Sequence, residues 1–305
     1  MSIKSTSTVN ITSTDKVWYI TGASKGMGLI FVQKLLEYGF KVVGTSRDKQ
    51  QLIDAVGAVG NSNNFLAVKV ELANEASVKA SFDEVLSKFG RIDVVVNNAG
   101  YSVAGALEES SNDDVRKNFD INVFGVFNVL RYVTPILRNQ GSGHVFNISS
   151  VGALIGYPGF SVYSSTKFAL DGLTEAYALE VKPFGINVTG INPGYFKTEF
   201  LSSGSYLKAE KKIDSYGHVH AIVDTHANDI SGNQRGDCAK LLDILIRAYE
   251  EKDNTTNHIF VGPDTYPLIR AKLQKYTADL DKWEQYATKT DRDDYVEPTT
   301  TQQQH

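Results

Sequence analysis

Short segments rich in β-branched residues alternate with helical patterns along most of the chain. The strand-like segments cover residues 17–20, 41–45, 65–68, 92–96, 144–148, 186–191 and 258–261. The helical patterns include one at about 74–88, a long one at about 114–139 and another at about 161–182. Strands joined through helices form right-handed β-α-β units, which build a mostly parallel sheet covered by helices on both faces. We therefore predict an α/β fold with a single doubly wound parallel sheet of about seven strands.

Composition limits what the chain can bind. Of its 305 residues 42% are hydrophobic, and a formal charge of −4 gives no general attraction to nucleic acids or to anionic membranes. No apolar run reaches the ~18 residues that span a bilayer, and the N-terminus lacks the apolar core of a signal peptide. A single cysteine, Cys238, excludes an internal disulfide framework. We expect a soluble, cytoplasmic protein that binds neither nucleic acid nor membrane.

No linker interrupts the alternation of strands and helices, so we expect one catalytic domain over residues 16–262. Residues 1–15 are polar and are expected to form a flexible arm. The polar segment 196–236 has no clear period, and we expect about 195–235 to act as a lid over the substrate. Residues 263–305 form an extension, with a helix at about 267–289 and a polar tail.

A glycine-rich turn, Thr21-Gly-Ala-Ser-Lys-Gly-Met-Gly28, follows the first predicted strand and opens the next helix. Glycines allow a tight turn and a close approach of the backbone to a pyrophosphate, and a helix N-terminus attracts anions. This context predicts a dinucleotide site in a Rossmann-type sheet, although the spacing differs from the general fingerprint. The expected cofactor contacts in the turn are Gly22, Ser24, Lys25, Gly26, Met27 and Gly28.

The end of the second predicted strand should lie beside the adenosine ribose. An acidic residue there would favour NAD, but this chain has Ser46 and Arg47. A guanidinium suits a phosphate, and Lys25 adds a second cation from the glycine-rich turn. We therefore predict NADPH as the cofactor. The alternative is that Lys25 and Arg47 are solvated surface charges, with Asp48 partly offsetting Arg47.

Tyr163 and Lys167 stand four residues apart in a helical pattern, with Ser150 thirteen residues before the tyrosine. Residues four apart share one face of a helix, so the phenol and the ammonium can reach the same reactant. A cation about 4 Å away favours the phenolate by ~4 kcal/mol at an effective dielectric of about 20. We expect Lys167 to lower the pKa of Tyr163 towards neutrality, with burial opposing part of the effect.

Together these motifs resemble the short-chain dehydrogenase/reductase family over roughly residues 16–262. The turn at 21–28 is similar to its T-G-x-x-x-G-x-G motif, and Asn97-Asn-Ala-Gly100 is similar to its N-N-A-G motif. Ser150 with Tyr163 and Lys167 resembles its catalytic serine and Y-x-x-x-K. Ser149 also precedes the tyrosine, but the thirteen-residue spacing selects Ser150. The segment Asn192-Pro-Gly194 with Thr198 resembles its P-G motif and the threonine beside the nicotinamide.

The resemblance implies roles for four catalytic residues. Tyr163 would give the proton in carbonyl reduction and take it in the reverse direction, and Ser150 would hold the substrate oxygen. Lys167 would also hold the nicotinamide ribose, and Asn122 would place a water that relays protons to Lys167. The alternative for Asn122 is a structural hydrogen bond. Further implied cofactor contacts are Glu71 (where the family more often has Asp), Asn98, Ala99, Gly100, Pro193, Gly194 and Thr198. Pairing through the two long helices implies a homodimer or homotetramer.

Substrate contacts are expected from the apolar segment 153–160 and from the lid. The candidate residues are Leu154, Tyr157, Tyr195, Phe196 and Phe200. Their apolar and aromatic character favours NADPH-dependent reduction of an apolar or aromatic ketone or aldehyde. One alternative is a secondary-alcohol or hydroxysteroid-type dehydrogenase working in the oxidative direction, and another is an NADPH-sensing protein without turnover. The histidines show no metal-ligand spacing, so no metal is expected.

Overall fold

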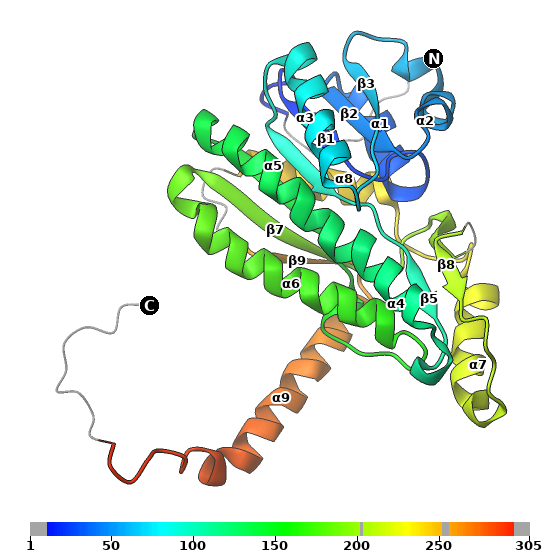
Figure 1. Ribbon diagram of the computed structural model, residues 1–305, viewed down its shortest axis with the longest axis vertical. Coiled ribbons are helices and arrows are strands. Elements are labelled where there is room, and N and C mark those ends of the chain that lie inside the picture. The colour runs from blue at the N-terminus through cyan, green and yellow to red at the C-terminus, as the bar shows by residue number, and fades with distance from the viewer. Residues whose placement is uncertain (1–10, 202–203, 252–255, 296–305) are drawn as a thin grey trace.

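A seven-stranded parallel sheet forms the centre of the computed structural model, which describes residues 11–201, 204–251 and 256–295. The strand order is β3-β2-β1-β4-β6-β7-β9 (Figure 1). The strands are β1 (Val17–Ile20), β2 (Lys41–Ser46), β3 (Phe65–Lys69), β4 (Val94–Asn97), β6 (Gly143–Ile148), β7 (Ile186–Pro193) and β9 (His258–Val261). All seven predicted strands are present, and the predicted fold class is confirmed. The strand order reverses between β1 and β4, and in such sheets ligands bind beyond the carboxyl ends of the strands at this point.

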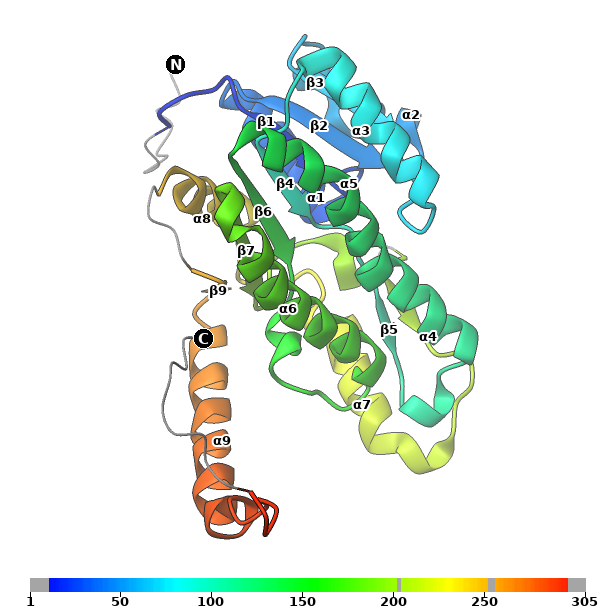
Figure 2. The same cartoon turned by 60° about the vertical axis from the view of Figure 1, so that its left-hand side comes forward.

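Helices cover both faces of the sheet (Figure 2), and each face has its own apolar layer. On β1, Trp18 and Ile20 enter one layer while Val17 and Tyr19 enter the other, because successive side chains of a strand point to opposite faces. Helices α1 (Gly26–Glu37), α2 (Lys49–Val56) and α8 (Cys238–Glu250) contribute to the first layer. Helices α3 (Glu75–Phe89), α5 (Gly125–Gln140) and α6 (Ser161–Val181) contribute to the second. Helix α8 was missing from the predicted elements, although its leucines follow a helical period.

Two long helices of the second layer carry the site. The predicted helix at 114–139 is a continuous run of α4 (Asn112–Phe119), a π-helical turn at Asp120–Phe124 and α5. Helix α6 leads into a short 3₁₀ turn that Gly185 closes at φ +71°, as expected where Pro183 and Gly185 follow a helix.

The lid segment is more ordered than its sequence indicates. The strand β8 (Tyr206–Lys208) pairs in parallel with β5 (Ser102–Ala104), and helix α7 (Gly217–Thr225) follows. Both ends of the segment meet where Phe196 bridges to Gly236. The absence of a clear period at 196–236 gave no sign of these elements, because the order of β8 comes from its pairing with β5. Residues 202–203 of the lid lie outside the described residues.

Helix α9 (Thr265–Ala287) fulfils the prediction of a helical extension and projects from the sheet-containing body (Figures 1 and 2). Of the predicted arm and tail, residues 1–10 and 296–305 lie outside the described residues. Over the described ranges, no helix is both long and apolar enough to cross a membrane.

Candidate active site

A cavity of about 660 Å³ opens at the carboxyl ends of the parallel strands. It brings together Gly22, Ser24, Lys25, Gly26, Met27, Ser46, Arg47, Glu71, Asn98, Ala99, Gly100, Pro193, Gly194 and Thr198 of the predicted cofactor contacts. Ser150, Tyr163 and Lys167 also line it, as do Tyr157, Tyr195, Phe196 and Phe200 of the predicted substrate contacts. Three predicted site residues, Gly28, Asn122 and Leu154, are not part of its wall.

The glycine-rich turn is built around contacts that a side chain would block. Gly22 has φ +66°, and a Cβ there would lie 2.8 Å from Ala99 Cα. A Cβ at Gly28 would lie 2.5 Å from Asn98 Nδ2, so this glycine lets α1 pack closely instead of touching a ligand. Asn98 Nδ2 donates to the backbone oxygens of Thr21 and Gly22 at 2.9 and 3.1 Å. The result is a glycine-lined cradle of backbone that fits a pyrophosphate.

Two cations flank this cradle. Helix α1 begins at Gly26 with no side chain capping its N-terminus, which leaves that end of the helix suited to an anion. Partial burial and the nearby Arg47 lower the pKa of Lys25, while Glu199 raises it. Lys25 and Arg47 also line a smaller cavity together with Ser24, Ser46, Asp48 and Gln51. Asp48 caps α2 by accepting from Gln51 N–H at 3.0 Å, so its carboxylate is already engaged.

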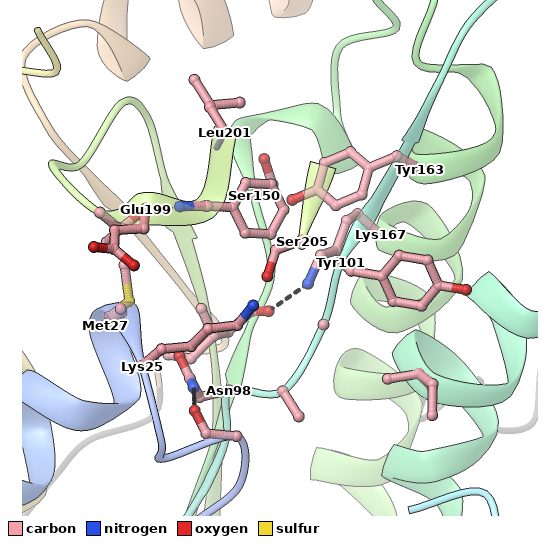
Figure 3. Close-up of a pocket in the computed structure, with 18 of the residues that line it drawn as sticks. Lys25, Met27, Asn98, Tyr101, Ser150, Tyr163, Lys167, Glu199, Leu201 and Ser205 are labelled. Carbon is pink, nitrogen blue, oxygen red and sulfur yellow. Dashed lines mark hydrogen bonds between the residues drawn. The ribbon is translucent and has the colours of Figure 1, made fainter. Parts of the chain in front are cut away.

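Tyr163, Ser150 and Lys167 lie around the same part of the larger cavity (Figure 3). Ser150 follows β6, and its Oγ accepts from Gly152 N–H at 3.0 Å. Lys167 Nζ donates to Ile148 O at 2.8 Å and lies 5.8 Å from the centre of the Tyr163 ring. The phenol, the hydroxyl and the ammonium thus come from two segments that the sheet holds together.

Burial controls the ionisation of this set. It raises the pKa of Tyr163 to about 12, against a smaller lowering by the hydrogen bond with Ser150. Burial also lowers the pKa of Lys167 to about 8, against the raising effect of Asp171. The expectation that Lys167 brings the pKa of Tyr163 towards neutrality is therefore wrong for this structure. Loss of hydration at the buried phenol raises its pKa, and the hydrogen bond with Ser150 offsets only part of this effect.

Asn122 lies in the π-helical turn with its side chain buried and fully used. Its Oδ1 accepts from Tyr101 N–H at 3.1 Å, and its Nδ2 donates to Tyr101 O at 2.9 Å and to Thr166 Oγ1 at 3.0 Å. These bonds connect the segment after β4 to α6. They agree with the alternative that Asn122 has a structural role. The water-placing role of Asn122 stays a prediction.

An acidic partner of Lys167 was not predicted. Asp171 follows Lys167 by one helical turn on α6 and accepts from Asn192 Nδ2 at 2.9 Å. His258 of β9 lies 3.8 Å from Asp171 and donates its Nε2–H to Glu175 at 2.9 Å. The spacing of four residues from Lys167 to Asp171 was the available signal, because residues so spaced share a helix face.

The segment 195–235 contributes both apolar side chains and a hydrogen-bonded polar pair, Tyr195 and His226, to the cavity wall. Phe160, Leu201 and Leu207 line the cavity, and the Phe200 ring centre lies 6.0 Å from that of Tyr163. His226 Nδ1 contacts the Ile222 carbonyl at 2.8 Å, so it carries the proton and Nε2 accepts from Tyr195 OH at 2.9 Å. No sequence spacing indicated His226, because the lid brings it to Tyr195 only through the fold.

Comparison with known proteins identifies the family of this chain. Residues 16–205 match the family model described as short chain dehydrogenase. The chain belongs to the short chain dehydrogenase family. It is 34% identical over 268 residues to the oxidoreductase BOA17 of Botryotinia fuckeliana, covering 88% of this chain and 96% of that protein. It is 41% identical over 197 residues to a 3-ketodihydrosphingosine reductase of Bacteroides thetaiotaomicron, covering 65% of this chain and 70% of the relative.

Solved structures agree with the family assignment. A short-chain dehydrogenase from Streptomyces avermitilis superposes with a TM-score of 0.82 at 34% identity, covering 91% of this chain and 99% of that one. Similar structures include a Brucella melitensis 3-ketoacyl-(acyl-carrier-protein) reductase complexed with NADH (TM-score 0.67, 26% identity, 81% and 96% covered). Another is ElxO with NADP bound (TM-score 0.65, 28% identity, 80% and 96% covered). The chain is thus an NAD(P)-dependent oxidoreductase that acts on alcohol or carbonyl groups.

Across the described ranges, no cluster of three or more His, Cys, Asp or Glu side chains is suited to a metal ion.

Proposed function

We propose that this protein uses NADPH to reduce apolar or aromatic ketones or aldehydes to alcohols. The observation that carries the proposal is that one cavity joins the glycine-rich cradle to Ser150 and Tyr163 under a largely apolar wall. The cofactor would supply the hydride, and the chain would position the carbonyl and supply the proton.

The preference for NADPH rests on this chain's own residues, because similar structures hold either NADH or NADP. Ser46 brings no charge to the end of β2, and Arg47 with Lys25 lines the smaller cavity beside the cradle. Besides partial burial, repulsion between the positive charges of Arg47 and Lys25 lowers the pKa of Lys25. A 2′-phosphate would relieve this repulsion, and a ribose hydroxyl would not.

The direction of reduction is supported by the ionisation of Tyr163. A phenol with a pKa of about 12 keeps its proton at neutral pH and can give it to the oxygen that becomes an alkoxide. Ser150 would donate a hydrogen bond to that oxygen, and the buried Lys167 cation would stabilise the charge that develops on Tyr163. The oxidative direction would first require ionisation of a phenol whose surroundings oppose it.

The substrate class follows from the cavity wall. Tyr157, Tyr195, Phe196 and Phe200 line the same cavity as Tyr163, and such surfaces favour apolar or aromatic carbonyl compounds. The related 3-ketodihydrosphingosine reductase is named for a keto substrate, which agrees with a ketone. Leu154 is dropped from the proposed pocket because it does not line the cavity.

We keep the proposed division of the chain: an arm at 1–15, a catalytic unit at 16–262 with its lid at about 195–235, and the extension at 263–305. A homodimer or homotetramer through α5 and α6 stays part of the proposal. Exposed aromatic residues at the start of α5 and on α6, Phe124, Phe127 and Phe168, support such pairing. We also keep a reducing, cytoplasmic setting as a proposal, which the single buried Cys238 suits.

The test is to follow NADPH absorbance with a panel of apolar ketones, aromatic aldehydes and short polar carbonyl compounds, and NADP⁺ reduction with the matching alcohols. We expect the apolar and aromatic carbonyl compounds to give the highest kcat/KM. Turnover only with the alcohols would support the oxidative alternative. Tight NADPH binding without turnover of any compound would support the sensing alternative.

A further inference from the structure

Helix α9 carries a regular apolar seam, and beyond Ile269 the rest of the described chain leaves it largely exposed. The seam positions alternate three and four residues apart and comprise Tyr266, Ile269, Leu273, Tyr276, Leu280, Trp283 and Ala287. This is the a/d spacing of a heptad repeat, which keeps one face of a helix against a partner helix. Ile269 is 6% exposed against the body, whereas Leu273, Leu280 and Trp283 are 55%, 71% and 57% exposed.

The helix leaves the body along its own axis, so that most of its length has solvent on all sides (Figures 1 and 2). Within the described ranges, no ion pair or hydrogen bond joins α9 from Arg270 onward to the sheet, its covering helices or the lid. A helix of 23 residues normally owes most of its stability to packing of its apolar face. We therefore expect another surface to cover the exposed seam.

Charges on α9 indicate what that surface is. The half nearer the body carries Arg270, Lys272 and Lys275, and the far half carries Asp279, Asp281 and Glu284, with Lys282 as the one exception. This polarity does not help the isolated helix, whose dipole favours acidic residues near its start and basic residues near its end. It suits a second helix of the same sequence running in the opposite direction, since the basic half of each copy then lies against the acidic half of the other. Parallel pairing would place like charges together.

Other partners fit less well. The sequence outside the described ranges is polar and includes the C-terminal stretch Glu-Pro-Thr-Thr-Thr-Gln-Gln-Gln-His, so it offers no matching apolar seam. A membrane surface would favour a strongly basic face, but positions 270–284 hold four basic and three acidic residues. We propose that α9 pairs antiparallel with α9 of a second copy of this chain through the seam of Leu273, Tyr276, Leu280 and Trp283. This pairing is separate from the proposed contact through α5 and α6 and would add to it.

The first experiment is sedimentation velocity on the full chain over a range of concentrations. Leu280→Glu places a charge in the seam and should raise the dissociation constant of the pair by about tenfold or more. The larger assembly should then fall to half its mass. Because Leu280 is 71% exposed in the single chain, the substitution leaves the body intact. Gln285→Glu, on the opposite face, is the matched control and should change nothing. Equal masses for Leu280→Glu and wild type would overturn the proposal.

A second readout reports the seam directly. The chain has two tryptophans, and Trp18 is fully buried, so iodide quenching reports Trp283. Quenching of the wild type should be weak and should increase severalfold in Leu280→Glu. Shielding of Trp283 that requires phosphatidylcholine–phosphatidylglycerol vesicles would identify a membrane surface instead and overturn the proposal.

Orientation is tested with cysteines, because the only native cysteine is buried. The double variant Arg270→Cys with Glu284→Cys should form an intermolecular disulfide under mild oxidation. Arg270→Cys alone should not, because antiparallel pairing separates the two copies of position 270. Rapid cross-linking of the single variant would show a parallel pair and contradict the antiparallel assignment.

Discussion

Tyr163 and Lys167 lie where the protein opposes the charge of both side chains. Burial moves the pKa of Tyr163 up to about 12 and that of Lys167 down to about 8, so both surroundings favour the neutral form. The raised pKa of Tyr163 suits the proposed reduction, because the phenol keeps the proton that it must donate to the substrate. Arg47, by contrast, is exposed at the end of β2. The proposed preference for NADPH depends on this residue.

At the residue scale, we expect Arg47→Asp to lower the preference for NADPH over NADH in kcat/KM by about 10- to 100-fold. A charge-assisted hydrogen bond to a phosphate contributes about 1.5–3 kcal/mol, and the new carboxylate also repels the phosphate. Kinetics with both cofactors and one carbonyl substrate measure this. Lys49→Asp, a similar charge change two residues further along and outside the smaller cavity, is the control. An unchanged cofactor ratio in Arg47→Asp would refute the assignment of Arg47 to the 2′-phosphate.

At the scale of elements, α6 carries more than the catalytic pair. Tyr163, Lys167, Asp171 and Glu175 follow one another at four-residue intervals, and they form one stripe along the helix. The stripe leads from the cavity to His258 on β9, so the ionisation of Lys167 depends on a neighbour outside the cavity wall.

Because Asp171 raises the pKa of Lys167, Asp171→Asn should lower it. In the wild type, the cation is lost as the pH rises through about 8, so kcat/KM for NADPH should fall above that pH. In Asp171→Asn the same fall should begin at a lower pH, while asparagine can still accept the bond from Asn192. Glu175→Gln, one turn further along α6, should leave the profile in place. A profile for Asp171→Asn that coincides with the wild type would contradict this coupling.

One buried carboxylate joins the residues before α4 to the proposed lid. Glu109 accepts from Ala106 N–H at 2.9 Å, Ile213 N–H at 2.8 Å and His220 Nε2–H at 2.6 Å. Burial opposes the charge, but these hydrogen bonds lower the pKa of Glu109 to about 2. A lowered pKa stabilises the fold above the ordinary value of about 4.5, and this contribution is lost as the pH falls from there towards about 2.

We expect Glu109→Gln to loosen the lid at neutral pH, because an amide has only one acceptor oxygen for three donors. Hydrogen exchange should become faster in α7 while the central sheet stays protected. Glu108→Gln, which changes an exposed carboxylate bonded to Tyr216, serves as the comparison and should have a smaller effect. Unchanged exchange in α7 would show that Glu109 does not hold the lid.

These elements also mark how far the sequence predicts the structure. β-branched runs located every strand of the main sheet, because buried parallel strands need continuous apolar residues. The glycine-rich turn and the Ser150–Tyr163–Lys167 spacing located the cradle and the polar catalytic part of the cavity. The β5–β8 pairing could not be predicted from the sequence, because it depends on contacts between segments about 100 residues apart. The raised pKa of Tyr163 was missed for a related reason, because burial is a property of the assembled fold.

At the scale of the whole molecule, the sheet topology decides where the chemistry can happen. The glycine-rich turn, the end of β2 and the Ser150 segment all lie at the carboxyl ends of parallel strands, and α6 supplies Tyr163 and Lys167 beside them. The proposed lid contributes side chains to the cavity at this edge, while α9 projects away from the sheet-containing body (Figures 1 and 2). The proposed reduction and the proposed pairing of α9 therefore use separate parts of the molecule.

The most direct test of the central claim is the turnover of Tyr163→Phe with NADPH and the best carbonyl substrate of the panel. Loss of the only proposed proton donor should lower kcat by roughly 10²–10⁴-fold, while the affinity for NADPH, measured by fluorescence titration, stays close to that of the wild type. Tyr177→Phe removes another buried hydroxyl of α6, one bonded to Thr134, and should keep full turnover. If Tyr163→Phe retained most of its activity, Tyr163 would not be the proton donor and the proposed mechanism would be wrong.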